Sequence, residues 1–247
     1  MIILRYIWRI WFYTLVLVTI LVLLPVLILT ILSDKTYKQF FFIARLWAYI
    51  VFYGMGMRYT LEKEYTPIKN KSYIIVANHT SMLDIMLMLI LVKDNPFVFV
   101  GKAELSKIPV FGFIYRRTCI LVDRNNAKSR GEVYDSARKK INQGLSICIF
   151  PEGGVSDNFN VLLDPFKEGA FKLALEHRLP ILPLTIYGLK YYFPFINSIG
   201  KPGRVYAKIH EPIEIETLTI DDKQVLKDKT YSLILNQLTL YKSKNPL

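Results

Sequence analysis

An uninterrupted apolar segment near the N-terminus constrains this chain more than any other feature. From Ile10 to Leu32 there are 23 residues without a charge. A helix rises about 1.5 Å per residue, so one of this length crosses the roughly 30 Å hydrocarbon core of a bilayer. The run exceeds the ~7–15 apolar residues of a signal peptide, and no small-x-small cleavage site follows it. We therefore predict a retained membrane anchor.

A second apolar segment follows, and it carries a charge. Gln39 to Tyr59 is rich in aromatic and branched side chains, but Arg45 stands near its middle. A charge at bilayer depth is unfavourable, whereas an arginine that snorkels to the headgroups lets the aromatic face of a helix enter one leaflet. Two interpretations stay open: a helical hairpin in one leaflet, or two spans. In either case we expect residues 1–59 to form a two-helix membrane anchor.

The location of the protein follows from where its charges lie. Both ends of such a hairpin lie on the same side of the membrane, and basic residues flank it there. The positive-inside tendency places that side in the cytoplasm. We expect the inner (cytoplasmic) membrane, with the catalytic domain on the cytoplasmic side. Cys119 and Cys148 lie in apolar, strand-like runs and are typical of core residues in a reducing compartment.

Composition narrows the classes of partner. The chain has a formal net charge of +12, which suits nucleic acid, an anionic membrane or an acidic carrier equally. The 52% of hydrophobic residues and the apolar N-terminus favour the membrane, and the basic residues form no aromatic-interleaved patch. We expect no nucleic-acid partner. No metal-ligand spacing and no nucleotide-binding glycine loop stands in the chain, so no cofactor is expected.

Residues 60–247 alternate short apolar runs with helical stretches, which predicts an α/β domain with a mixed, largely parallel sheet flanked by helices. The expected strands are Tyr73–Ala77, Phe97–Val100, Cys119–Val122, Leu145–Phe150, Ile181–Ile186 and Val205–Ile209. The expected helices are Met82–Leu91, Val133–Asn142, Phe166–Glu176 and Asp221–Tyr241.

His79 and Asp84 are the residues best placed for chemistry. His79 follows the expected strand at its carboxyl end, where α/β sheets place their sites. Side chains five residues apart diverge on a regular helix, so the two meet only if Thr80 and Ser81 form a bend. The carboxylate then holds one ring nitrogen and leaves the other free to take a proton. Alternatively, Ser81 and Asp84 form a capping box, and both roles can coexist. The remaining histidines, His177 and His210, suit caps or the surface.

Four blocks in order resemble the glycerolipid acyltransferase family, whose best-known members acylate lysophosphatidic acid at the sn-2 position. Asn78 to Asp84 is similar to the family's His-x-x-x-x-Asp motif. The second block contains Gly101-Lys102-Ala103-Glu104-Leu105 and Ile120-Leu121-Val122-Asp123-Arg124. The third begins with Phe150-Pro151-Glu152-Gly153, and the fourth is Leu179-Pro180-Ile181-Leu182-Pro183.

The resemblance implies roles for these residues. His79 is the base for the acceptor hydroxyl, Asp84 orients it, and attack occurs directly on acyl-CoA or acyl carrier protein. Lys102 and Arg124 are implied to bind phosphate. The glycine at 153 lets the chain approach closely, so backbone N–H groups near Glu152 and Gly153 are candidate donors to the oxyanion.

One departure affects the acceptor. The family's third motif reads Phe-Pro-Glu-Gly-Thr-Arg-Ser, whereas this chain has Val155 at the position of the arginine implied to grip phosphate. Either another cation substitutes, with Lys167 as a candidate, or the acceptor differs. Three functions stay open: acylation of lysophosphatidic acid, acylation of another lysolipid such as a lyso-aminolipid, and an inactive lipid-binding or membrane-tethering protein.

Overall fold

The computed structural model describes residues 2–123, 126–155, 158–196 and 199–245. Seven strands form one sheet in the order β1-β7-β6-β2-β5-β3-β4, and every neighbouring pair is parallel except β6 and β7. The prediction of a mixed, largely parallel sheet is therefore confirmed. The strands are β1 Arg58–Lys63, β2 Ile74–Ala77, β3 Phe97–Lys102, β4 Ile120–Val122, β5 Ser146–Ile149, β6 Ile181–Tyr187 and β7 Arg204–Ile209.

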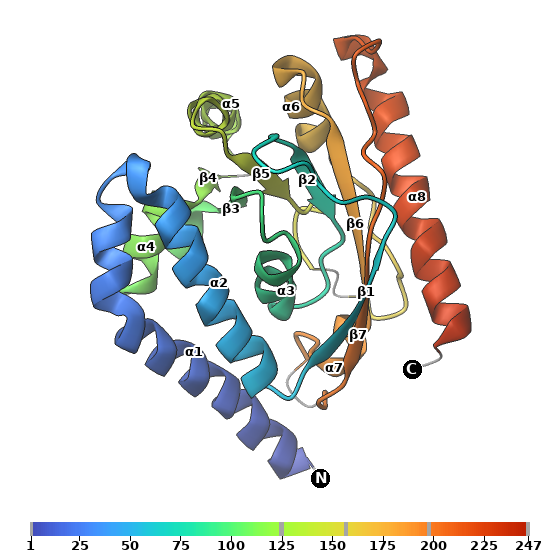
Figure 1. Ribbon diagram of the computed structural model, residues 1–247. Helices are drawn as coiled ribbons and strands as arrows, with labels where there is room; N and C mark the ends of the chain where they lie inside the picture. Colours follow the sequence, from blue (N-terminus) through green and yellow to red (C-terminus); the bar gives the residue numbers. More distant parts are fainter. Residues whose placement is uncertain (1, 124–125, 156–157, 197–198, 246–247) are drawn as a thin grey trace.

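Helices cover both faces of this sheet. α3, with α2 and then α1 stacked outside it, lies on one face, and α5, α6 and α8 lie on the other (Figure 1). The α-helices are α1 Ile2–Ile31, α2 Tyr37–Gly54, α3 Leu83–Leu91, α4 Phe111–Thr118, α5 Ala127–Asn142, α6 Gly169–His177, α7 Leu189–Tyr192 and α8 Lys223–Lys244. Short 3-10 turns are η1 Asp34–Thr36, η2 Ala103–Lys107 and η3 Ile220–Asp222.

The central strands are those with continuous apolar sequences. Every residue of β2 and of β6 is buried, as expected for strands covered by helices on both faces. β1 is different, because it is an edge strand whose side chains are mostly exposed. It begins at Arg58, two residues before the predicted start of the α/β domain at residue 60.

The two N-terminal helices form the expected hairpin, and it is attached to the domain at both ends of α1. Near its start, the buried Arg9 guanidinium donates hydrogen bonds to the carbonyls of Pro194 (2.6 Å) and Ile196 (3.1 Å). Beyond its end, Asp34 pairs with Lys140 of α5 at 2.9 Å. α1 therefore lies along the domain rather than projecting from it (Figure 1).

α2 is attached to the domain by buried contacts. The buried hydroxyl of Tyr37 donates to the carbonyl of Phe97 at 2.9 Å, and Ala48, Val51 and Phe52 are fully buried. Arg45 donates its Nε–H to the carbonyl of Leu89 in α3 at 3.2 Å, so part of its guanidinium is bound within the protein.

Candidate active site

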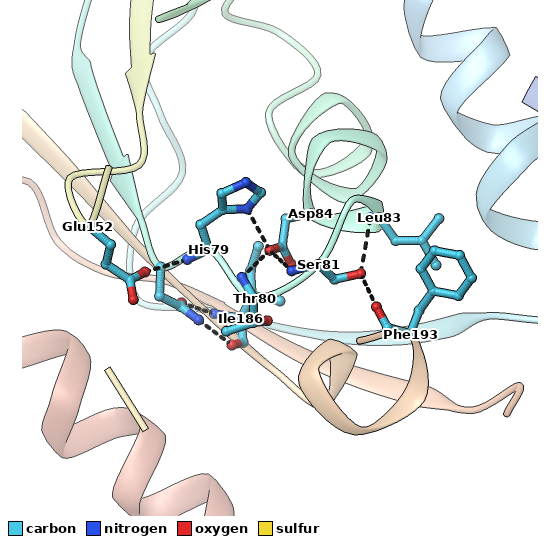
Figure 2. A network of polar contacts seen from close by, with 9 residues as sticks. His79, Thr80, Ser81, Leu83, Asp84, Glu152, Ile186 and Phe193 are labelled. Atoms are coloured by element: carbon cyan, nitrogen blue, oxygen red, sulfur yellow. Dashed lines mark hydrogen bonds and ion pairs between the residues drawn. The ribbon is translucent and has the colours of Figure 1, made fainter. Parts of the chain in front are cut away.

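The chain bends sharply between β2 and α3, which places the two motif residues together. Nδ1 of His79 lies 2.9 Å from Oδ2 of Asp84. The same oxygen accepts the backbone N–H groups of Thr80 (2.6 Å) and Ser81 (2.8 Å). Thr80 and Ser81 thus form the bend that the sequence required, and the carboxylate fixes that bend (Figure 2).

The capping arrangement is also present in part. Asp84 accepts the N–H of Ser81, and the hydroxyl oxygen of Ser81 accepts the N–H of Leu83 at 3.2 Å. The Ser81 hydroxyl donates in turn to the carbonyl of Phe193 at 2.6 Å, which ties the motif to the segment that follows α7. Starting the helix and holding His79 are therefore compatible tasks for Asp84.

The geometry selects one tautomer of His79. A carboxylate only accepts hydrogen bonds, so in the neutral ring Nδ1 carries the proton and Nε2 has the lone pair. Among the described residues, Nε2 has no hydrogen-bond partner, and the side chain is 18% exposed. The ring stacks on Phe150 with centroids 4.2 Å apart. His79 therefore presents a basic nitrogen to a partly open space.

Asn78 fixes the backbone just before the histidine. Its side-chain amide donates to the carbonyl of Ile186 and accepts the N–H of the same residue, both at 2.8 Å. This pair of bonds continues the β2–β6 ladder beyond the last paired backbone residues. Sequence reasoning gave Asn78 no structural role, although a polar residue directly after a buried strand was a usable signal.

Glu152 joins two loops at the site. Its buried carboxylate accepts the backbone N–H of His79 at 2.6 Å (Figure 2). The other carboxylate oxygen accepts the backbone N–H of Asp164 at 3.0 Å. Burial raises the pKa of this carboxyl to about 8, although the two N–H groups stabilise its charged form. Glu152 thus positions His79 through the backbone. The N–H of Gly153 donates to the carbonyl of Phe150 at 3.1 Å. That backbone N–H groups near Glu152 and Gly153 bind an oxyanion stays a prediction.

The other predicted binding residues lie further out. Lys102 is exposed at the end of β3, and Lys167 is exposed before α6. The Lys167 side chain covers Gly153, whose φ is +81°, and a Cβ at Gly153 would come within 2.6 Å of the lysine Nζ. Arg124 lies outside the described residues. Within the described part of the chain, neither lysine lines the small cavity beside His79.

That cavity has a volume of about 80 Å³. Its polar lining comes from His79, Thr80, Glu152 and Lys190. Lys190 was not predicted from the sequence. A lone charge in the apolar run Leu184 to Phe193 was the available signal. The rest of the lining is Val155, Phe159, Val161, Leu162, Pro194, Phe195 and Ile196.

The contacts of His210 place it inside the domain. His210 is 2% exposed and lies between Thr185 (2.8 Å) and Glu64 (3.1 Å), so the expectation of a cap or surface position was wrong for it. In the described ranges, no group of three or more His, Cys, Asp or Glu side chains is placed to hold a metal ion.

Fold and geometry together define a class: an α/β protein with a His-x-x-x-x-Asp pair at the carboxyl end of a central strand. The Acyltransferase family model matches residues 58–187, more than half of the 247 residues, and the chain belongs to this family. The resemblance inferred from the four motifs is thereby confirmed.

Named relatives are similar to the chain over most of its length. The chloroplastic 1-acyl-sn-glycerol-3-phosphate acyltransferase of Brassica napus is 31% identical over 74% of this chain and 53% of its own length. The 1-acyl-sn-glycerol-3-phosphate acyltransferase alpha of Mus musculus is 28% identical over 77% of this chain and 66% of its own. The chain thus spans between half and two thirds of these relatives.

A solved structure confirms the fold. The crystal structure of the 1-acyl-sn-glycerophosphate (LPA) acyltransferase PlsC from Thermotoga maritima matches with a TM-score of 0.81, covers 98% of each chain and is 24% identical. This coverage includes the N-terminal helices as well as the sheet.

Proposed function

We propose that this acyltransferase moves a fatty acyl group from acyl-CoA or acyl carrier protein to the sn-2 hydroxyl of lysophosphatidic acid, giving phosphatidic acid. The observation that carries the proposal is the 2.9 Å contact between Nδ1 of His79 and the fully buried Asp84, which leaves Nε2 without a hydrogen-bond partner among the described residues. A histidine held in this way is suited to act as a general base.

The proposed reaction needs no covalent enzyme intermediate. Nε2 of His79 takes the proton of the acceptor hydroxyl as its oxygen attacks the thioester carbon. The C–O bond forms, the C–S bond breaks, and the thiolate leaves with the proton that His79 carries. Asp84 keeps the ring in one orientation and stabilises its protonated form.

The lysophosphatidate acceptor is supported by the names of the relatives, several of which are 1-acyl-sn-glycerol-3-phosphate acyltransferases. A different lysolipid is a second candidate because Val155 stands where the family motif has an arginine. An uncharged residue at that position removes one ionic contact to a phosphate, and such a hydrogen bond contributes about 1.5–3 kcal/mol.

We propose further that residues 1–59 anchor the domain in one leaflet. Within the described residues, α1 is the one helix long and apolar enough to cross a membrane. Many of its large apolar side chains are exposed, including Ile3 (74%) and Val22 (72%), as in a lipid-facing surface. A span would place the turn at Asp34 on the side opposite the domain, but Asp34 bonds Lys140 of that domain.

Labelling tests this placement and its cytoplasmic side. We expect Asp34→Cys and a domain control, Lys229→Cys, to react with a membrane-impermeant maleimide from the cytoplasmic side alike. Burial raises the pKa of Cys119 to about 12 and that of Cys148 well above its usual range, so the native thiols react slowly. Labelling of residue 34 only from the opposite side would show that α1 spans the bilayer.

The acceptor is tested with purified protein and a set of lysolipids. Lysophosphatidate, lysophosphatidylethanolamine, a lyso-aminolipid and monoacylglycerol are each offered with both thioester donors, and the products are quantified by mass spectrometry. We expect the highest kcat/KM for lysophosphatidate. A rate on lysophosphatidate no better than that on the phosphate-free acceptors would exclude it as the preferred substrate.

A further inference from the structure

A buried lysine stands beside the proposed site. The Lys190 side chain, in α7 directly after β6, is 9% exposed. Its ammonium donates to the carbonyl of Asn158 at 3.2 Å and to that of Val161. It also lies 5.6 Å from the centre of the Phe159 ring. An ammonium has three N–H donors, so these two bonds leave one for a further acceptor.

No carboxylate of the described residues forms an ion pair with this ammonium. Glu152 and Asp164 act on it only from a greater distance, and burial raises the pKa of Glu152 to about 8. The same burial lowers the pKa of Lys190. A buried cation without a counterion is unfavourable, and such an arrangement is typical of a site that receives an anion.

The cavity connects this cation to the histidine. Lys190, His79 and Val155 line the same space of about 80 Å³. Sites for drug-sized ligands enclose about 300–1,000 Å³, so this one has the size of a headgroup rather than of a whole lipid. Its apolar rim includes Phe195 (51% exposed) and Ile196 (44% exposed). The Ile196 carbonyl accepts from Arg9 of α1, so the rim adjoins the membrane-facing helix.

We propose that Lys190 supplies the cation that binds the phosphate of the acceptor lipid, in the cavity where Val155 presents no charge. The proposal rests on the proposed function, because it assigns a residue to the headgroup of that acceptor. Lys167, the alternative cation, is exposed and covers the outer side of Gly153. Lys190 and His79 line the same cavity, whereas Lys167 is not among its described lining residues.

The test compares two acceptors rather than one. Lys190→Gln removes the charge but keeps an amide that can donate to the carbonyls of Asn158 and Val161. We expect the ratio of kcat/KM for lysophosphatidate to that for monoacylglycerol to fall roughly ten- to hundredfold, the range expected from a charge-assisted hydrogen bond. Adding Val155→Arg to this variant restores part of the ratio. Lys229→Gln, on the exposed side of α8, leaves both rates unchanged.

Two outcomes overturn the inference. Equal losses on both acceptors show that Lys190 only holds the segment from Asn158 to Val161 in place. A fall in the ratio with Lys167→Gln but not with Lys190→Gln assigns the phosphate to Lys167. In both cases the wild-type protein still acylates lysophosphatidate, whereas a wild-type protein that does not acylate it refutes the proposed function itself.

The unaltered protein provides a second measurement in case Lys190→Gln does not fold. Lysines are acetylated with acetic anhydride, and modification of Lys190 is quantified by mass spectrometry with glycerol 3-phosphate or glycerol present. We expect glycerol 3-phosphate to protect Lys190 at least threefold more than glycerol does. Equal modification under both conditions contradicts the inference.

Discussion

Replacing Asp84 with asparagine separates the chemistry of the site from the stability of the fold. Oδ2 of Asp84 accepts three N–H groups, from His79, Thr80 and Ser81. Hydrogen bonds to a charged group contribute about 1.5–3 kcal/mol and neutral ones about 0.5–1.5 kcal/mol, so Asp84→Asn weakens each by about 1 kcal/mol. The neutral amide also removes the burial of a charge, which offsets part of the loss. We expect the free energy of unfolding to fall by about 1–3 kcal/mol.

The effect on acyl transfer is expected to be far larger. The amide oxygen has to take the place of Oδ2, because the N–H groups of Thr80 and Ser81 point at it. The ring therefore keeps its orientation and its Nδ1 proton, but it loses the negative charge that stabilises its protonated form during proton transfer. General acid–base catalysis contributes about 10²–10⁴-fold, and kcat should fall by that factor. The assay is thiol release from acyl-CoA at saturating acceptor, with unfolding followed by circular dichroism. Asp94→Asn, at a side chain 54% exposed, is the matched control. A kcat within tenfold of wild type in a folded Asp84→Asn protein would refute the assignment.

Three further changes test the surroundings of the site. Phe150→Leu removes the ring stacked on His79, and an aromatic pair of this kind contributes about 0.5–1.5 kcal/mol. In steady-state assays kcat/KM should therefore fall about two- to twelvefold. An unchanged kcat/KM would mean that stacking does not position the His79 ring. Arg9→Met removes the donor shared by the carbonyls of Pro194 and Ile196 and should lower the free energy of unfolding in urea by about 1.5–3 kcal/mol. Lys229→Met, at an exposed position of α8, is the comparison, and an equal effect of both changes would contradict the role of Arg9. Glu152 has a pKa of about 8 in the folded protein, against an ordinary value of 4.5. Between these two pH values the folded protein holds a proton that the unfolded chain has released. The free energy of unfolding of the wild type therefore falls as the pH rises from 4.5 to about 8. The slope contributed is at most about 1.4 kcal/mol per pH unit, and urea titrations of Glu152→Gln should lack it; an identical slope in the variant would contradict the assignment.

The central strands could be predicted from the sequence because their local composition is apolar throughout. β2, β5 and β6 are continuous apolar runs, and runs of this kind form central strands wherever the chain places them. β1 was not predicted, because an edge strand with four exposed positions out of six has no apolar pattern. α4 was missed for a related reason, since it is short and ends in Arg116 and Arg117.

The residues of the site also differ in whether the sequence could predict their contacts. The His79–Asp84 contact was predictable because it is local, and one bend decides it. Lys190 was not predictable as part of the cavity lining, and Arg9 was not predictable as the residue that holds the lining residue Pro194. Their partners are far away in sequence, since the carbonyl that Arg9 bonds lies 185 residues on. The sequence suggested that Arg9 belongs to the anchor, but its 4% exposure follows from a tertiary contact that no local pattern encodes.

The most direct test of the central claim is phosphatidate formation by wild-type and His79→Ala proteins, purified and assayed in mixed micelles with lysophosphatidate and each thioester donor. The account predicts phosphatidate from the wild type and a rate at least about a hundredfold lower from the variant. Vesicle binding should be unchanged, because the sequence places His79 outside the anchor and its side chain contacts Asp84 and Phe150. Loss of these two contacts should lower the temperature of thermal unfolding while the variant still folds. A variant that still forms phosphatidate at a comparable rate would contradict the account.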